Sequence, residues 1–427
     1  MNILVWSRYG DALSIARLMK EKDGNNVLLY IDYESNKEVG DGIVPKVDNW
    51  RDYIDWCDMI VVDDENQGEW VEELQNQGKV VFGTNTFGGK LENNRHYASE
   101  IMEKLGIRTI PHWEFETIQD TIDFIEEYPG RYVFKPFGQH PRYFTKIGEM
   151  KNGQDMIWFL KYLQKIWQGG QANQIQEYIE GIEVGLCANF SIDHFVKPYE
   201  LNFEHKHMRL YGLGSNIGEA GTLQLFVNNS RIFDEIILPF EDYLKNTKYV
   251  GQFDINCKVN EEGIFPMEWT CRFGIPATYG YNEALHIRWS DFFWKCATGE
   301  LEDGYAETDR FIVIVKLDLE PVTDLKEENQ YYIPTRVPIF FDFDPIGAEP
   351  GFFEGDLIRD EQRQYYVVGK QGHIGVVIGS GETVQEAQDS CYKIVQKIYS
   401  PFSIVYNPEI GDKYEYIESF LKKMKII

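Results

Sequence analysis

The chain has 427 residues, enough for two or three domains, and its hydrophobic fraction of 43% is typical of a folded protein. Its 42 basic and 69 acidic residues give a net charge of −27. This surplus argues against a nucleic-acid partner, because phosphate backbones are bound by clustered Lys and Arg. Without a signal-peptide pattern or an apolar run of roughly 18 residues, we expect a cytoplasmic protein with no membrane partner. The six cysteines stand apart without a CxxC, so we expect buried reduced thiols.

The first 90 residues alternate short apolar runs with helical patterns. Strand, helix, strand alternation predicts a parallel sheet with crossover helices. The expected strands are 2–6, 27–31, 59–62 and 79–82, and the expected helices are 12–19 and 68–75. We therefore predict a Rossmann-like N-terminal domain over 1–90. It lacks G-x-G-x-x-G, the fingerprint of dinucleotide binding.

The rest of the chain predicts mixed α/β and α+β structure. A helix is expected at 91–105, where Gly106 and Pro111 follow the helical pattern. Further helices are expected at 118–127, 155–167 and 383–398, and strands at 132–135, 174–179 and 311–319. Strand-rich sequence from residue 311 onward predicts a small α+β C-terminal domain over 311–427.

Residues 251–276 form the most informative segment for chemistry. The sequence predicts a hairpin on which Asp254 and Glu268 face the same side. Two converging carboxylates suit Mg²⁺, which takes hard oxygen ligands and leaves positions for phosphate oxygens. Arg272 shares that face by period-two alternation and could hold a phosphate or a carboxylate. From the spacing alone, an ordinary hairpin with solvated acids is favoured over the metal site.

Three further segments carry polar groups that could bind a nucleotide. Residues 176–184 place acceptors at the end of an apolar strand, suited to an adenine edge and a ribose, or simply to solvent. Lys135 ends another apolar strand and could reach a phosphate, although surface lysines are common there. In 204–221, His205 and His207 accompany a Gly-rich stretch whose amides could hold an anion. The two histidines are either metal ligands or solvated strand residues.

Taken in order, these segments resemble the ATP-grasp superfamily and, within it, the phosphoribosylamine–glycine ligases. The similar segments are LENNRHY at 91–97, YVFKPFGQ at 132–139, IQEYIEGIEVGL at 175–186, EHKHMRLYGLGSNIGEAG at 204–221 and MEWTCRFGIP at 267–276. The resemblance implies an ATP-grasp region over 91–310, with a lid subdomain at about 112–180, between the Rossmann-like and α+β domains.

This resemblance implies a reaction as well as a fold. ATP would phosphorylate a carboxylate, and an amine would displace phosphate from the acyl phosphate to form an amide. The implied cofactors are ATP and Mg²⁺, with Mn²⁺ as an alternative metal, and the implied substrates are an amino acid and an amine, as in purine biosynthesis. A monomer or homodimer is expected.

The resemblance also implies roles for individual residues. Arg95 and Lys135 would contact phosphates, Glu177 and the main chain near Ile179 the adenine, Glu183 the ribose, Asp254, Glu268 and Thr270 the metal, and Lys206, Asn216 and Arg272 would act in catalysis. Lys146 would supply charge in the phosphate loop.

Four departures from the family pattern separate into two groups. Thr270 replaces an Asn ligand, and 138–148 replaces a Gly-rich phosphate loop, with Arg142 and Lys146 as its charges. Both concern ATP handling and leave open a nucleotide-binding pseudoenzyme with a regulatory or assembly role. Residues 275–277 lack two family acids, and 6–11 replaces a Gly-rich loop. Those two changes favour a ligase with a different amino acid or amine.

Overall fold

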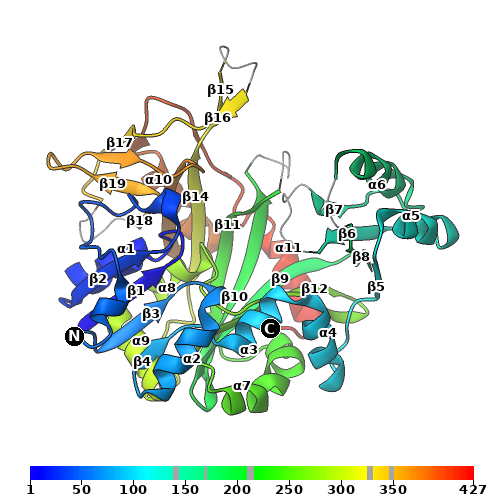
Figure 1. The fold of residues 1–427 in the computed structure, drawn as a ribbon, viewed down its shortest axis with the longest axis horizontal. Coiled ribbons are helices and arrows are strands. Elements are labelled where there is room, and N and C mark those ends of the chain that lie inside the picture. Colours follow the sequence, from blue (N-terminus) through cyan, green and yellow to red (C-terminus); the bar gives the residue numbers. More distant parts are fainter. Residues whose placement is uncertain (138–143, 168–170, 209–215, 325–329, 346–350) are drawn as a thin grey trace. The chain divides into compact units, whose positions relative to one another are not determined.

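The structure is a computed structural model that describes residues 1–137, 144–167, 171–208, 216–324, 330–345 and 351–427 (Figure 1). The chain divides into two compact units. Unit 1 comprises Met1–Ile101, Glu183–Asn256 and Glu268–Ile427, and unit 2 comprises Met102–Ile182 and Cys257–Met267. Unit 2 contains the region 112–180 expected as a lid subdomain. The expected boundaries at 90/91 and 310/311 both fall inside unit 1 and stay predictions.

The N-terminal part of unit 1 is a parallel sheet with the strand order β2-β1-β3-β4. Its elements are β1 (Asn2–Ser7), α1 (Leu13–Glu21), β2 (Asn26–Ile31), β3 (Met59–Val62), α2 (Gly68–Asn76) and β4 (Val80–Phe82). The central strands bury nearly every side chain, as expected when both faces of a parallel sheet are covered. The Rossmann-like prediction is therefore confirmed, with element ends shifted by one or two residues.

A nine-stranded sheet in the order β13-β12-β9-β10-β11-β14-β21-β18, with β23 paired to β14, follows in the chain. Its strands are β9 (Ile182–Ser191), β10 (His194–His207), β11 (Asn216–Val227), β12 (Gly251–Asn260), β13 (Gly263–Thr270), β14 (Phe311–Leu319), β18 (Phe352–Glu354), β21 (His373–Gly381) and β23 (Ile404–Val405). Strand β14 pairs antiparallel with β11, so the C-terminal region continues the central sheet. Helix α10 (Val384–Val395) packs on β21 and begins at Thr383, whose hydroxyl accepts a bond from the Glu386 amide.

Unit 2 contains its own sheet, in the order β5-β8-β6-β7. The elements are β5 (His112–Phe115), α5 (Ile118–Glu127), β6 (Tyr132–Pro136), β7 (Lys146–Ile147), α6 (Gln154–Ile166) and β8 (Asn173–Glu177). Helices α5 and α6 bury their apolar faces in one core with Phe134 and Ile175 of the sheet. Thr117 caps α5 by accepting a bond from the Asp120 amide, as is usual for a threonine at a helix start.

The prediction of a single helix at 91–105 is wrong. The chain instead forms α3 (Thr86–Asn93) and α4 (Arg95–Lys104), separated by Asn94 in an extended conformation. Asn94 Oδ1 accepts a 3.0 Å bond from the Tyr97 amide, and Asn85 accepts one from Gly88 in the same way. An asparagine side chain that satisfies the free amides of a new first turn starts a helix, so Asn94 ends one and opens the next.

The remaining elements complete unit 1. They are α7 (Glu241–Thr247), α8 (Tyr281–Ala284), α9 (Trp289–Thr298), β15 (Val322–Asp324), β16 (Gln330–Tyr332), β17 (Val337–Phe341), β19 (Leu357–Arg359), β20 (Tyr365–Val367), β22 (Ile398–Tyr399) and α11 (Tyr414–Lys423). All six cysteines are buried and free, which confirms that expectation. Within the described ranges, none of the helices combines the length and apolar character needed to cross a membrane.

Candidate active site

Carboxylates from three strands of the central sheet gather around one lysine in unit 1. Lys206 Nζ lies 2.5 Å from Glu183 Oε1, 3.5 Å from Glu204 Oε2 and 3.9 Å from Glu268 Oε1. Glu183 comes from β9, Glu204 and Lys206 from β10, and Glu268 from β13. The register pairs Asn202 with Gly185 across β10 and β9, which places Glu204 opposite Glu183 two residues further on. The structure therefore brings together Lys206, Glu183 and Glu268, which the sequence assigned to three different roles.

This cluster carries more negative than positive charge. Burial lowers the pKa of Lys206, but Glu183, Glu204 and Glu268 outweigh it and the pKa is raised. Burial raises the pKa of Glu204, and Lys206 opposes that change. Burial and the neighbouring acids also hold the pKa of Glu219 well above its ordinary value. One lysine thus offsets several carboxylates, and an additional cation would stabilise the ionised cluster.

Buried oxygens beside this cluster fit a hard metal ion. Among the described residues, Asn202 Oδ1, Asn256 Oδ1 and Glu219 Oε1 are buried without a hydrogen-bond partner. The amide of Asn256 donates a 2.8 Å bond to Glu204, and that of Asn202 lies 3.5 Å from Asp254. Carboxylate and amide oxygens are the ligands that Mg²⁺ takes.

The expected metal ligands occupy different surroundings. Asp254 is buried, and burial together with Glu200 and Glu204 holds its pKa well above the ordinary value. Glu268 leaves 60% of its side chain exposed. In the described part of the chain, no group of three or more His, Cys, Asp and Glu is arranged to hold a metal by itself. That agrees with Mg²⁺ sites built from one or two carboxylates and completed by substrate phosphates.

Arg272 lies in a second ionic cluster of unit 1. Strand β13 ends at Thr270, so the alternation expected to place Arg272 beside Glu268 does not extend to it, and that inference is wrong. Instead, Arg272 Nε lies 3.3 Å from Glu65 and Nη2 lies 3.2 Å from Glu92. Burial raises the pKa of Glu92 to about 7, and Arg272 opposes the shift. Both carboxylates hold the guanidinium in place.

Two other expected residues of unit 1 lie near these clusters. Arg95 begins α4, where desolvation lowers the pKa of its guanidinium and the charge of Glu268 raises it. Asn216 begins β11 and pairs with His207, and its side chain lies outside the described part.

His205 accepts a 3.3 Å bond from the Gly411 amide, and burial lowers its pKa to about 4. His205 is therefore a neutral, partly buried residue, held by the Gly411 amide.

The nucleotide residues expected in unit 2 lie on its sheet. Lys135 pairs with Gln174 across β6 and β8, and Glu177 is exposed at the end of β8, opposite Tyr132. Lys146 pairs with Phe134, so the register places Lys135 and Lys146 on opposite faces. Ile179 follows β8 and is partly buried. Arg142 and most of the altered phosphate loop lie within 138–143, outside the described residues.

Sequence reasoning missed several residues of the lysine cluster. Glu200, Asn202 and Glu204 precede Lys206 at every second position of β10, all on one face of a largely buried strand. Polar residues with a period of two on a buried strand were the signal that could have found them. Asn256 has the same relation to Asp254 on β12.

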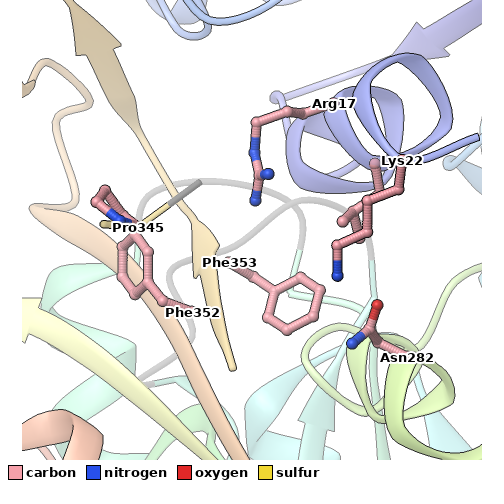
Figure 2. Close-up of a pocket in the computed structure, with 7 residues that line it drawn as sticks. Arg17, Lys22, Asn282, Pro345, Phe352 and Phe353 are labelled. Carbon is pink, nitrogen blue, oxygen red and sulfur yellow. The ribbon is translucent and has the colours of Figure 1, made fainter. Parts of the chain in front are cut away.

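A small pocket elsewhere in unit 1 is lined by Arg17 of α1 and by Lys22, which directly follows that helix, together with Asn282, Phe352 and Phe353 (Figure 2). Arg17 also forms a buried ion pair with Glu354. The pocket is shallow and has no group placed for chemistry among its described lining residues, so we assign it a packing role.

Glu200 gives the first prediction. Burial raises its pKa to about 7, so between pH 4.5 and that value the folded state keeps a proton that the unfolded chain has released. The free energy of unfolding then falls as pH rises through this window, by up to about 1.4 kcal/mol per pH unit. Glu200→Gln removes the titration. We expect equal stability at pH 5 and a variant more stable by about 3 kcal/mol at pH 8.

Urea unfolding at the two pH values measures this effect. The matched control is Glu418→Gln, at a partly exposed position of α11, which should leave the pH dependence of the wild type unchanged. A Glu200→Gln protein with the wild-type pH slope would show that Glu200 is ionised in the folded state.

Comparison with known proteins supports the architecture. Phosphoribosylamine–glycine ligase of Neisseria meningitidis serogroup B is 22% identical over 352 residues, covering 80% of this chain and 81% of that protein. The crystal structure of phosphoribosylamine–glycine ligase from Thermotoga maritima matches with a TM-score of 0.69 at 19% identity, covering 96% of this chain and 100% of that one.

A third match extends the comparison to a nucleotide complex. The biotin carboxylase domain of Hydrogenobacter thermophilus 2-oxoglutarate carboxylase, solved with MgADP, ADP and bicarbonate, has a TM-score of 0.63 at 12% identity, covering 95% of this chain and 91% of that one. No protein-family profile matches the chain. The chain has the three-domain ATP-grasp fold, as its sequence predicted. Within that class, it is a distant, nearly full-length homologue of the phosphoribosylamine–glycine ligases.

Proposed function

We propose that this chain is an ATP- and Mg²⁺-dependent carboxylate–amine ligase that forms an amide and releases ADP and phosphate. The observation that carries the proposal is the cluster of Glu183, Glu204 and Glu268 around Lys206 on an ATP-grasp sheet. Phosphoryl transfer needs little covalent chemistry from a protein, which mainly positions the reactants and neutralises charge. A lysine beside oxygen ligands for Mg²⁺ supplies both requirements.

The chain's own residues then have distinct tasks in unit 1. Lys206 would hold a phosphate group, and its charge favours the ionised form of the neighbouring carboxylates. Glu268 and Asp254, with Thr270, would hold Mg²⁺, which supplies neutralisation of phosphate charge when bound. Glu183 would accept from a ribose hydroxyl, and Arg95 would contact phosphate. Arg272, fixed by Glu65 and Glu92, would orient the carboxylate substrate. Asn216 would also act in catalysis.

The resemblance also implies nucleotide-binding roles for residues of unit 2. Lys135 would contact phosphates, Glu177 would accept from the adenine amino group, and the main chain near Ile179 would bind the adenine edge. Lys146, on the opposite face of the sheet from Lys135, would supply charge to the phosphate loop. Distant homology to ligases that use small molecules supports an amino acid and an amine as substrates. The cytoplasm as location, and a monomer or homodimer as assembly, stay predictions.

The decisive experiment measures ADP release from Mg²⁺-ATP against a panel of amino acids combined with amines, with the product identified by mass. We expect turnover that needs both substrates. Normal ATP binding without turnover for any pair would overturn the ligase proposal. The same result would favour the second candidate, an ATP-binding pseudoenzyme, which Thr270 in place of an asparagine ligand supports.

Glu268 tests the metal assignment. Because 60% of its side chain is exposed, Glu268→Gln removes the charge at little cost to folding. We expect ADP release to fall by about 100-fold or more at limiting Mg²⁺, since a metal ligand has been weakened. The matched control is Glu262→Gln, an exposed acid in the turn of the same hairpin. Equal ADP release by both variants at every Mg²⁺ concentration would remove Glu268 from the site.

A further inference from the structure

The N-terminal sheet of unit 1 has a topological switch point. In the strand order β2-β1-β3-β4, the connection after β1 leads to β2 on one side of the sheet, and the connection after β3 leads to β4 on the other side. In open parallel sheets, ligands bind outside the carboxyl ends of such strands. The loop Ser7–Ala12 leaves β1 there, and Asp63 and the residues after it leave β3. Gly10 adopts a φ of +103°, which lets the first loop curl so that its amides point inward.

Amide groups in a loop of this kind form a concave site for an anion, typically a phosphate. In this chain the donors converge on a carboxylate of the protein. The amides of Arg8 and Ala12 each donate a 3.1 Å bond to Asp63, whose side chain is buried. The Ser7 hydroxyl donates to the same carboxylate, and the Gly10 amide donates a 2.9 Å bond to Ser7 Oγ. A carboxyl group of the protein therefore takes the place that a phosphate would fill.

Charges around this loop also disfavour a phosphate. Arg8 pairs with Asp64 at 3.2 Å, and Arg272 pairs with Glu65 and Glu92. Burial and the neighbouring Asp11 raise the pKa of Asp63 to about 8, while the Ser7 hydroxyl and the Arg8 amide oppose that shift. Whether the carboxyl is protonated or ionised, its oxygens accept the hydrogen bonds of the Arg8 and Ala12 amides. A phosphate would lose its donors and face several acids.

We propose that Asp63 is a specificity-determining residue, and that the amine substrate of this ligase is an unphosphorylated amine. The inference rests on the proposed function and deepens it by naming the substrate class. It separates this chain from relatives named for phosphoribosylamine, an amine that carries a phosphate.

Binding of ribose 5-phosphate tests the inference without any turnover. We expect wild-type protein to show no binding at millimolar concentration in calorimetry or phosphorus NMR. Asp63→Gly frees the amides of Arg8 and Ala12, and we expect it to bind ribose 5-phosphate at least about tenfold more tightly than wild type, a gain of about 1.4 kcal/mol. The matched control is Asp58→Gly, which removes an aspartate that accepts the Asn2 amide at the opposite edge of the same sheet. It should leave binding unchanged.

The result on the wild type keeps the inference falsifiable if Asp63→Gly fails to fold. Wild-type binding of ribose 5-phosphate at micromolar concentration, displaced by inorganic phosphate, would overturn it. So would an amine panel in which phosphoribosylamine supports faster ADP release than every unphosphorylated amine. An absence of turnover with any amine would refute the ligase proposal, whereas the binding measurements would still report on Asp63.

Discussion

Replacing Lys206 by methionine should lower ATP-dependent ligation by about 100-fold to 1,000-fold, the usual cost of removing a charged group that stabilises a transition state. Lys206 is the cation that Glu183, Glu204 and Glu268 share. Its loss removes a positive charge from the phosphates and leaves the three clustered carboxylates to repel them. ADP release and the dissociation constant of ATP are the measurements, and both should worsen.

Lys206→Arg and Lys79→Met provide the comparison. Arginine keeps the charge and should retain much of the ATP affinity. Lys79 resembles Lys206 in exposure, 28% against 24%, and pairs with Asp55 at 3.1 Å in the N-terminal sheet region. Its methionine variant should keep wild-type ADP release. A Lys206→Met protein as active as Lys79→Met would show that the cluster has a structural role only.

Replacing Glu354 by alanine should destabilise unit 1 by about 3–5 kcal/mol, because it leaves a buried charge without its partner. Glu354 is 1% exposed and Arg17 is 3% exposed. Arg17 Nε lies 2.7 Å from Glu354 Oε1, and the Ser14 hydroxyl donates a 2.6 Å bond to Oε2. The attraction of Glu354 keeps the pKa of Arg17 raised despite burial. The midpoint of urea unfolding measures the loss.

Two comparisons serve as controls for that experiment, a surface ion pair and a double replacement. Glu418→Ala breaks the surface pair with Lys422 on α11 and should cost less than about 0.5 kcal/mol. Replacing Arg17 and Glu354 together by leucine removes both buried charges and should recover most of the stability lost by Glu354→Ala. If Glu354→Ala unfolds at the same urea concentration as Glu418→Ala, the pair carries no stabilising interaction.

The fold was largely predictable because its strands and helices carry strong local patterns. The run NILVW at 2–6 has no polar residue after its first, so it predicts a buried parallel strand, and β1 is one. The break at Asn94 was missed because the apolar pattern continues across it, and only the capping bonds of its side chain separate the two helices.

The site was predictable only in part. The motif resemblance selected Glu183, Lys206 and Glu268. The spacing of these residues does not predict that both carboxylates contact the Lys206 ammonium group, or that Glu204 joins them. These contacts depend on the register between β9 and β10, which pairs residues far apart in the sequence, such as Gly185 with Asn202. Arg272 was misplaced because strand alternation was carried beyond Thr270, where β13 ends. Asp63 was overlooked because two of its partners are the main-chain amides of Arg8 and Ala12, which leave no trace in side-chain patterns.

The division of the chain into two units determines how unit 2 could be produced as a separate protein. Its two segments, Met102–Ile182 and Cys257–Met267, are joined to unit 1 at four points in the backbone, so cutting out one continuous stretch would leave it incomplete. The segments nevertheless meet closely, since Asn260 Nδ2 donates a 2.9 Å bond to Glu180 O. A short glycine-rich bridge from residue 182 to residue 257 would therefore restore a single chain. Such a joint makes unit 2 a module that protein engineers can transplant, with its sheet and the helices α5 and α6 carried along as one piece.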